Sequence, residues 1–171
     1  MKPTLLITLL LLSVGAIAQK PEENLQNLKI QLPKASAPVA SYVNAVKAGN
    51  LIFLAGKGPR KENGEYITGK LGEGLSIQQG TEAARLTAIN QLAVLKEMLG
   101  DLSKIKRIVK VNGYVNSASN FYDQPQVMNG FSDLMIQVFG EKGRHARTSL
   151  GVNTLPMNIA IEVEMIVEVE D

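Results

Sequence analysis

The chain contains no cysteine, no tryptophan and a single histidine, His145, among its 171 residues. Without cysteine it can form no disulfide, hold no metal through thiolates and use no thiolate nucleophile. One histidine excludes a metal site with several histidine ligands, and a Ser-His-Asp triad would have to use His145. These absences leave no basis for predicting a metal site.

A large excess of one charge is also missing. Lys and Arg together number 18 and Asp and Glu number 16, which gives a net charge of +2 with the signs interspersed. That balance predicts neither nucleic acid nor an anionic membrane as a partner. With 45% hydrophobic and 20% charged residues, the composition is that of an ordinary globular protein with one sizeable core.

The N-terminus reads as an export signal. Lys2 precedes an apolar run at residues 5–14, and Ala16 and Ala18 supply the small residues that a signal peptidase reads. We expect residues 1–18 to be a signal peptide cut after Ala18, and the mature protein to be periplasmic or secreted. The run is too short to span a bilayer stably, and no cysteine follows it for a lipid. No membrane anchor is therefore expected after cleavage.

Residues 19–40 are expected to form an N-terminal arm, followed by one domain at 41–171. Prolines punctuate the arm, which is predicted to be extended with one short strand at 28–32. The domain opens with a β-hairpin, because the alternating residues 42–47 and the apolar residues 51–55 flank a turn. Gly56 and Gly58 end the hairpin; they allow either a simple turn or the close approach of a ligand to the backbone.

Two amphipathic helices follow. Ser76 and Gln79 have the spacing of a capping box, and Gly100 ends the helix that they begin. Gln124-Pro125 opens the second helix, which Gly140 ends. The intervening residues 105–115 read as a strand with one buried side, formed by Ile105, Val109, Val111 and Val115.

The C-terminal segment contains two further strands. Residues 159–168 alternate apolar and acidic, the pattern of a strand with one buried face. Just upstream, Arg147 lies between small residues, where a strand would fix a guanidinium that can still reach a carboxylate ligand. Two helices can cover only one face of the resulting sheet, so we expect the other face to contact further copies of the chain.

The order of these features resembles the RidA/YjgF family of enamine/imine deaminases, also called the endoribonuclease L-PSP family. The resemblance covers 41–171. The family pattern has a Tyr before the hairpin, a glycine after the second strand and an Asn in the second helix. It continues with Ala-Arg followed by a small residue, then Leu-Pro, and Glu-x-Glu in the last strand. In this chain they are Tyr42, Gly56, Asn129, Ala146-Arg147-Thr148, Leu155-Pro156 and Glu162-Val163-Glu164. Where the family usually has Ser-Gly-Gln, this chain has Ala55-Gly56-Lys57.

The resemblance implies an α+β fold of chorismate-mutase-like type, a mixed sheet with two helices on one face, and a homotrimer with clefts between subunits. It implies hydrolysis of 2-iminopropanoate-type substrates to 2-oxo acids and ammonia, without a cofactor. Arg147 would bind the substrate carboxylate, helped by Gly56 and Asn129. Glu162 and Tyr42 would be the catalytic residues that position a water.

Each of these residues also has a structural interpretation. Arg147 can pair with a carboxylate such as Glu162 across the sheet or across an interface. Glu162 can be a solvated strand residue, and Tyr42 can be a half-buried one. Asn129 is expected to support the cleft by hydrogen bonding. His145 is expected to point to the opposite face of its strand from Arg147 and to be structural.

Three functions compete on this basis. The first is an exported imine deaminase. The second is a non-catalytic trimer that binds small carboxylate metabolites in the same cleft. The third, a ribonuclease, is least favoured because the chain has neither a basic aromatic stripe nor a histidine pair for acid/base cleavage.

Overall fold

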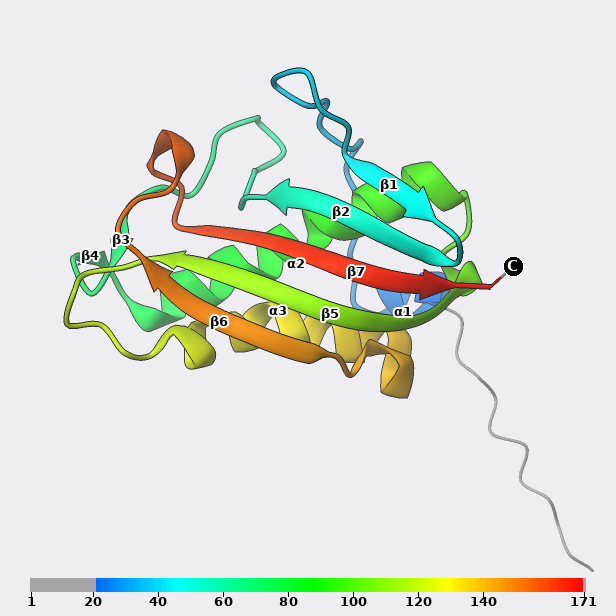
Figure 1. Ribbon diagram of the computed structural model, residues 1–171. Coiled ribbons are helices and arrows are strands. Elements are labelled where there is room, and N and C mark those ends of the chain that lie inside the picture. The colour runs from blue at the N-terminus through cyan, green and yellow to red at the C-terminus, as the bar shows by residue number, and fades with distance from the viewer. Residues whose placement is uncertain (1–20, 171) are drawn as a thin grey trace, which may run out of the picture.

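A five-stranded mixed sheet backed by two long helices forms the body of the protein (Figure 1). The computed structural model describes residues 21–170; the signal peptide expected at 1–18 lies outside this range. The strand order is β1-β2-β7-β5-β6. The strands of the sheet are β1 Ala45–Ala48, β2 Leu51–Lys57, β5 Ile105–Asn116, β6 Ala146–Val152 and β7 Ile161–Val169. The helices are α1 Pro21–Asn27, α2 Ile77–Leu99 and α3 Gln124–Phe139.

The connections follow from the pairing of the strands. β1 and β2 form the predicted antiparallel hairpin, and β7 pairs antiparallel with both β2 and β5. β5 and β6 are parallel, with α3 as the crossover between them. The short parallel strands β3 (Lys70–Leu71) and β4 (Gly74–Leu75) lie in the connection from β2 to α2. Three single turns of 3-10 helix occur in the described part of the chain: Leu102–Lys104, Gly140–Gly143 and Pro156–Asn158.

Local sequence signals set the ends of both long helices. Ser76 accepts from the Gln79 backbone N–H and the Gln79 side chain accepts from the Ser76 backbone N–H, which confirms the capping box before α2. Gly100 ends α2 with φ 73°, a left-handed conformation that favours glycine. The backbone N–H of Gly140 closes α3 by donating to Ile136.

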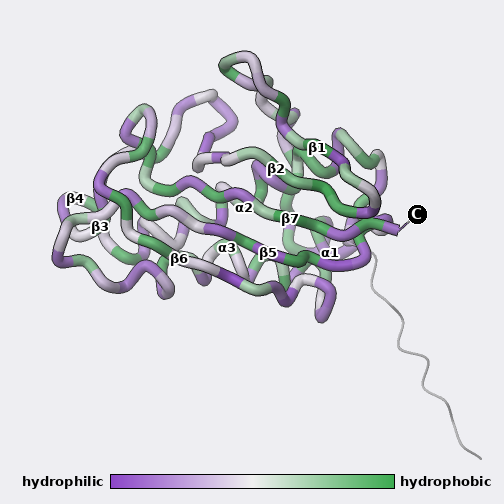
Figure 2. Tube along the Cα trace, in the orientation of Figure 1, coloured by the Kyte–Doolittle hydropathy of each residue, from purple (hydrophilic) through white to green (hydrophobic). Residues whose placement is uncertain are grey.

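The core lies between the sheet and the helices. Along β7 the residues alternate between buried and half-buried, as the sequence predicts. Figure 2 shows hydrophobic and hydrophilic residues in turn along this strand, except at the half-buried but hydrophobic Ile166. Ile161, Val163 and Val167 are fully buried against the helix side. The opposite, open face carries the acidic residues of β7.

The predicted buried side of β5 is partly wrong. Val109 is only half-buried, whereas its neighbour Ile108 is fully buried. The β5–β7 pairing shifts register between Ile105 and Arg107 and again between Ile108 and Lys110. Such irregularities change which residues point inward, so strict alternation over 105–115 cannot hold.

The N-terminal arm is also different from the prediction. It begins with α1, which lies beside α3, and residues 28–32 form no strand. Leu25 is buried, and the Asn24 side chain donates to the Val138 carbonyl at 2.9 Å. The arm is therefore part of the folded body.

The open face of the sheet retains exposed apolar side chains. Val46, Phe53 and Leu150 lie on this face, with exposed fractions of 53%, 43% and 52%. Within residues 21–170, no helix is both long enough and apolar enough to cross a bilayer.

Candidate functional site

A pocket of about 400 Å³ lies at the end of β2 and brings together three of the predicted site residues. Tyr42 contributes from the segment before β1, Gly56 from β2 and Glu162 from β7. Its wall also includes Ser36 and Lys57. A carboxylate, a phenol and exposed backbone at one strand end can bind a small polar molecule.

Gly56 is required by the position of Glu162. A Cβ built on Gly56 would overlap Oε1 of the Glu162 side chain. The β2–β7 register shifts between Leu54 and Lys57, so Gly56 lies within an irregular part of the strand. Irregularities of this kind re-aim side chains at the edges of sheets and beside functional sites. The glycine thereby lets the Glu162 carboxylate lie directly against the backbone of β2.

Burial and a neighbouring carboxylate shape the acidity of Glu162. Burial raises the pKa of the Glu162 carboxyl, and the negative charge of Glu164 raises it further. Oε1 of Glu164 accepts from the Asn112 side chain at 2.9 Å and from the Tyr114 hydroxyl at 3.0 Å. Of these two carboxyl groups, Glu162 is the one whose surroundings favour the protonated form.

Arg147 lies elsewhere, between β6 and α3. Its Nη1 donates to Asn129 Oδ1 and to Ser132 Oγ, both at 3.0 Å, and its Nη2 donates to the Pro125 carbonyl at 3.1 Å. All three acceptors are uncharged, and none of the ion pairs within 21–170 involves Arg147. The guanidinium is therefore held in place while its charge remains open to an anion. Within one chain, the alternative pairing with Glu162 is not formed.

His145 and Arg147 share a partner, contrary to the expectation that they point to opposite faces. They are two positions apart, and residues two apart share a face. His145 Nδ1 lies 2.7 Å from the Gly143 carbonyl, which can only accept, so Nδ1 carries the proton. Nε2 then accepts from the Ser132 hydroxyl at 3.0 Å. Burial lowers the pKa of His145, which favours this neutral form.

In one chain the two groups of residues do not meet. Arg147 pairs with Val111, whose side chain is buried on the helix side, and Glu162 pairs with Tyr114 on the open face. β5 also separates β6 from β7, and two strand spacings amount to about 10 Å. Asn129 lies with Arg147, so the predicted residues form two half-sites: Tyr42, Gly56 and Glu162 in one, Arg147 and Asn129 in the other.

Two contributors to these half-sites were not predicted. Ser132 belongs to the second, and its position three residues after Asn129, on the same side of a helix, was a signal for it. Lys57 belongs to the first. Only 8% of Lys57 is exposed, and its Nζ donates to Asn44 Oδ1 at 2.6 Å.

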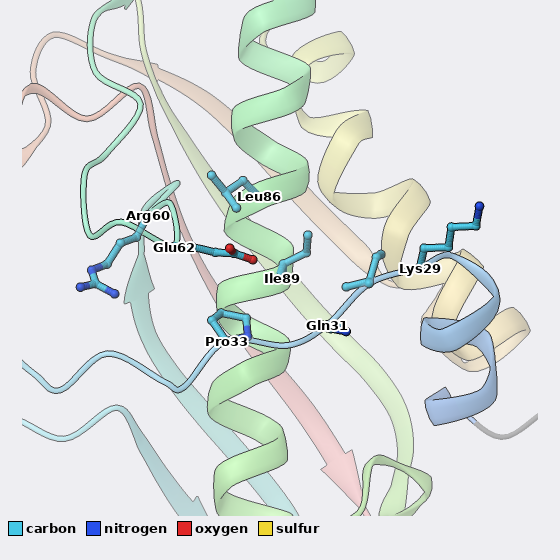
Figure 3. Close-up of a pocket in the computed structure, with 8 residues that line it drawn as sticks. Lys29, Gln31, Pro33, Arg60, Glu62, Leu86 and Ile89 are labelled. Atoms are coloured by element: carbon cyan, nitrogen blue, oxygen red, sulfur yellow. The ribbon is translucent and has the colours of Figure 1, made fainter.

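A smaller pocket of about 190 Å³ lies between the arm and α2 (Figure 3). Pro33 approaches α2 from the arm, while Leu86 and Ile89 line the helix side. The predicted site residues do not line it. No group of three or more His, Asp or Glu residues within 21–170 is arranged to hold a metal ion.

The chain matches a family model over residues 22–169, described as "YjgF/chorismate_mutase-like, putative endoribonuclease". Protein TCP17 of Trypanosoma cruzi is 44% identical over 149 residues, which is 86% of this chain and 93% of that protein. A 2-iminobutanoate/2-iminopropanoate deaminase of Dermatophagoides farinae is 32% identical, over 82% of this chain and 95% of that protein.

Solved structures agree on the fold. The crystal structure of Atu1372 from Agrobacterium tumefaciens, a protein described as of unknown function, superimposes with a TM-score of 0.81 at 38% identity. The superposition covers 90% of this chain and 94% of that one. The range matched by the family model, 22–169, includes both half-sites. The chain therefore belongs to the RidA/YjgF family, with its chorismate-mutase-like fold.

Proposed function

We propose that the protein hydrolyses reactive 2-imino acids of the 2-iminopropanoate type to 2-oxo acids and ammonia, in clefts between the subunits of a homotrimer. One observation carries the proposal. A guanidinium without a carboxylate partner and a half-buried carboxyl group lie in separate half-sites of one chain. The similarity to a 2-iminobutanoate/2-iminopropanoate deaminase supports the choice of substrate.

In the proposed cleft, Arg147 of one subunit binds the carboxylate of the substrate and Glu162 of the next activates a water. The water oxygen bonds to C2 while the π pair of the C=N bond moves to nitrogen, and Glu162 takes a proton from the water. Glu162 returns that proton to the nitrogen, which gives a tetrahedral carbinolamine. Glu162 then takes the proton of the new hydroxyl group and passes it to the nitrogen, while the C2=O bond forms, the C2–N bond breaks and ammonia leaves. A carboxyl group with a raised pKa suits both steps near neutral pH.

The residues beside Glu162 have supporting roles in this proposal. Tyr42 and the backbone at Gly56 hold the water and the nitrogen of the substrate in line with Glu162. Because an imine is already electrophilic, binding and orientation supply much of the required acceleration.

The exposed apolar side chains on the open face support subunit contact. Val46, Phe53 and Leu150 would be covered in the trimer. A subunit contact on this face accounts for apolar residues that a monomer would leave in water.

Subunit complementation tests the shared cleft directly. Arg147→Ala and Glu162→Gln each inactivate one half-site, so each variant alone should be inactive toward enzymatically generated 2-iminopropanoate. In trimers co-assembled at random from equal amounts of the two, about a quarter of the clefts combine two intact half-sites. About a quarter of wild-type ammonia release is therefore expected, against none if each site is built from one subunit.

The same assay addresses the second candidate function, a trimer that binds small carboxylate metabolites without turning them over. Saturable binding of a 2-oxo acid that is lost in Arg147→Ala, without any ammonia release by wild type, would favour that candidate. The charge left open at Arg147 serves either function.

We also propose that the protein is exported and that cleavage after Ala18 leaves Gln19 as the first residue. The proposed cut precedes α1, which begins at Pro21, so the whole of that helix would be retained. The intact mass of the protein recovered from the exported fraction tests this; a mass that includes residues 1–18 would contradict it.

A further inference from the structure

Lys57 is a buried cation in the wall of the Glu162 pocket. Its side chain is at the end of β2, and 8% of the residue is exposed. Among residues 21–170 its Nζ makes one hydrogen bond, to Asn44 Oδ1 at 2.6 Å, and takes part in no ion pair. An ammonium group has three N–H donors, so two of them remain for another acceptor.

The surroundings do not neutralise this charge. Desolvation by burial lowers the pKa of Lys57, and no nearby carboxylate offsets the effect. A buried cation whose partner is a neutral amide is costly, because it has lost water without gaining a counter-ion. An anion in the adjoining pocket would remove that cost.

Asn44 holds the ammonium close to the wall of the pocket. The Asn44 side chain donates to the Ser36 carbonyl at 2.9 Å, so its oxygen faces Lys57. The Asn44 backbone carbonyl accepts from the Ala55 N–H at 2.9 Å. Ser36 and Tyr42, which both precede Asn44 in the chain, line the pocket. The lysine is thus fixed between β2 and the segment before β1 that forms part of the wall.

The pocket is larger than a three-carbon imino acid requires. Its volume of about 400 Å³ lies within the range of sites that enclose drug-sized ligands. A substrate with a longer, acidic side chain would use both the space and the second cation.

We propose that the Lys57 ammonium binds a second anionic group of the substrate, so that the cleft prefers imino acids derived from dicarboxylic amino acids. This inference rests on the proposed function, because it assigns a substrate class to the same cleft. The C1 carboxylate is bound by Arg147 of the neighbouring subunit, and the distal carboxylate by Lys57. Charge-assisted hydrogen bonds of this kind are among the stronger polar contacts in proteins.

Binding of two 2-oxo acids of equal carbon number tests the preference without requiring turnover. Calorimetry of the full chain should show 2-oxoglutarate binding at least about tenfold more tightly than 2-oxopentanoate, a difference of about 1.4 kcal/mol. Lys57→Gln should remove the difference, whereas Lys47→Gln, at an exposed position of β1, should keep it. Equal affinities in wild type, or an unchanged preference in Lys57→Gln, would overturn the proposal.

A structural role for Lys57 predicts a different result. If the lysine only holds Asn44, Lys57→Gln weakens both ligands equally, and that outcome also overturns the proposal. Lys57→Arg, which keeps the charge, should retain part of the preference for 2-oxoglutarate. Circular dichroism and the melting temperature check that each variant is folded.

The experiments distinguish a failure of the inference about Lys57 from a failure of the proposed deaminase activity. Deamination of 2-iminopropanoate together with equal binding of the two acids would sink the inference and leave the proposed function intact. Lys57-dependent binding of 2-oxoglutarate with no deamination of any imino acid would instead support the role of Lys57 and overturn the proposed deaminase activity.

Discussion

The Glu162 carboxylate lies so close to the backbone of Gly56 that a methyl group at position 56 would occupy the space of Oε1. Gly56 has no positive φ, so the requirement for glycine here is steric. One missing Cβ on β2 therefore determines where a carboxylate of β7 can lie.

Gly56→Ala is expected to abolish most of the activity by displacing Glu162. The substitution is compatible with the backbone, so the main effect should be on the position of the carboxylate rather than on the fold. We expect kcat/KM to fall more than about tenfold, since small displacements of catalytic groups can cost up to about a hundredfold. Ammonia release measured beside a thermal melt checks this.

The double variant Gly56→Ala/Glu162→Ala distinguishes steric displacement from a general loss of stability. Without the Glu162 side chain the added methyl group has room, so the stability costs of the two substitutions should not add. Additive changes in the free energy of unfolding would show that the contact does not exist in solution.

The raised pKa of Glu162 predicts a stability difference that depends on pH. A folded-state pKa above the unfolded one favours the protonated form, so its stabilising effect is present at low pH and is lost as pH rises through the folded pKa. Glu162→Gln does not ionise. Its melting temperature should therefore rise relative to wild type as pH increases, and the two should converge in acid. A difference that does not vary with pH would contradict the shift.

Glu164→Gln tests the second cause of that shift. It removes the negative charge that raises the pKa of Glu162 but keeps an oxygen to accept from Asn112 and Tyr114. The acidic limb of the pH profile of kcat/KM should move to lower pH, because Glu162 then remains ionised further into acid.

The elements of the domain were predictable where a local signal existed. The capping box at Ser76 and Gln79, the left-handed Gly100 and the alternation along β7 depend on neighbouring residues, and the structure confirms them. The inward residues of β5 were not predictable, since its irregular pairing depends on β7. α1 was missed because its buried residues contact α3, more than a hundred positions away.

The residues of the candidate site can also be separated into those that the sequence predicted and those that it did not. Tyr42, Gly56, Asn129, Arg147 and Glu162 came from the family resemblance, and the structure distributes them over two half-sites. Lys57 was visible only as a departure from the family pattern. Nothing local indicated that its charge would be buried, because Asn44, to which its ammonium donates, lies 13 positions earlier in the chain.

Ser132→Ala should weaken substrate binding without changing the chemical step. Ser132 accepts from Arg147 and donates to His145, so its loss frees the guanidinium from one of three acceptors. We expect an increase of about fivefold in the Kd of a 2-oxo acid, which is about 1 kcal/mol for one hydrogen bond. Calorimetry measures it, with the exposed Ser119→Ala as the control. A fall in kcat at unchanged Kd would instead place Ser132 in the chemistry.

Arg147→Lys separates charge from geometry at the same position. A lysine keeps the positive charge but cannot contact Asn129, Ser132 and Pro125 with a planar fork. It should therefore bind the carboxylate less tightly than wild type and more tightly than Arg147→Ala. Equal losses in both variants would mean that orientation, rather than charge, dominates.

The arm should contribute measurably to stability, because α1 is fastened to both long helices. Glu22 accepts from the Leu102 backbone N–H at 2.8 Å and pairs with Lys96 of α2 at 3.0 Å. The Asn24 side chain donates to Val138 of α3, and Leu25 is 5% exposed. Leu25→Ala removes buried methyl groups and should lower the free energy of unfolding by about 2 kcal/mol. Gln26→Ala, exposed on the same helix, should change it by less than about 0.5 kcal/mol. Urea denaturation of the two variants checks the pair. Equal midpoints would mean that α1 does not pack against the domain in solution. The hydrogen bond from Asn44 to the Ser36 carbonyl would then be what keeps this part of the chain at the pocket.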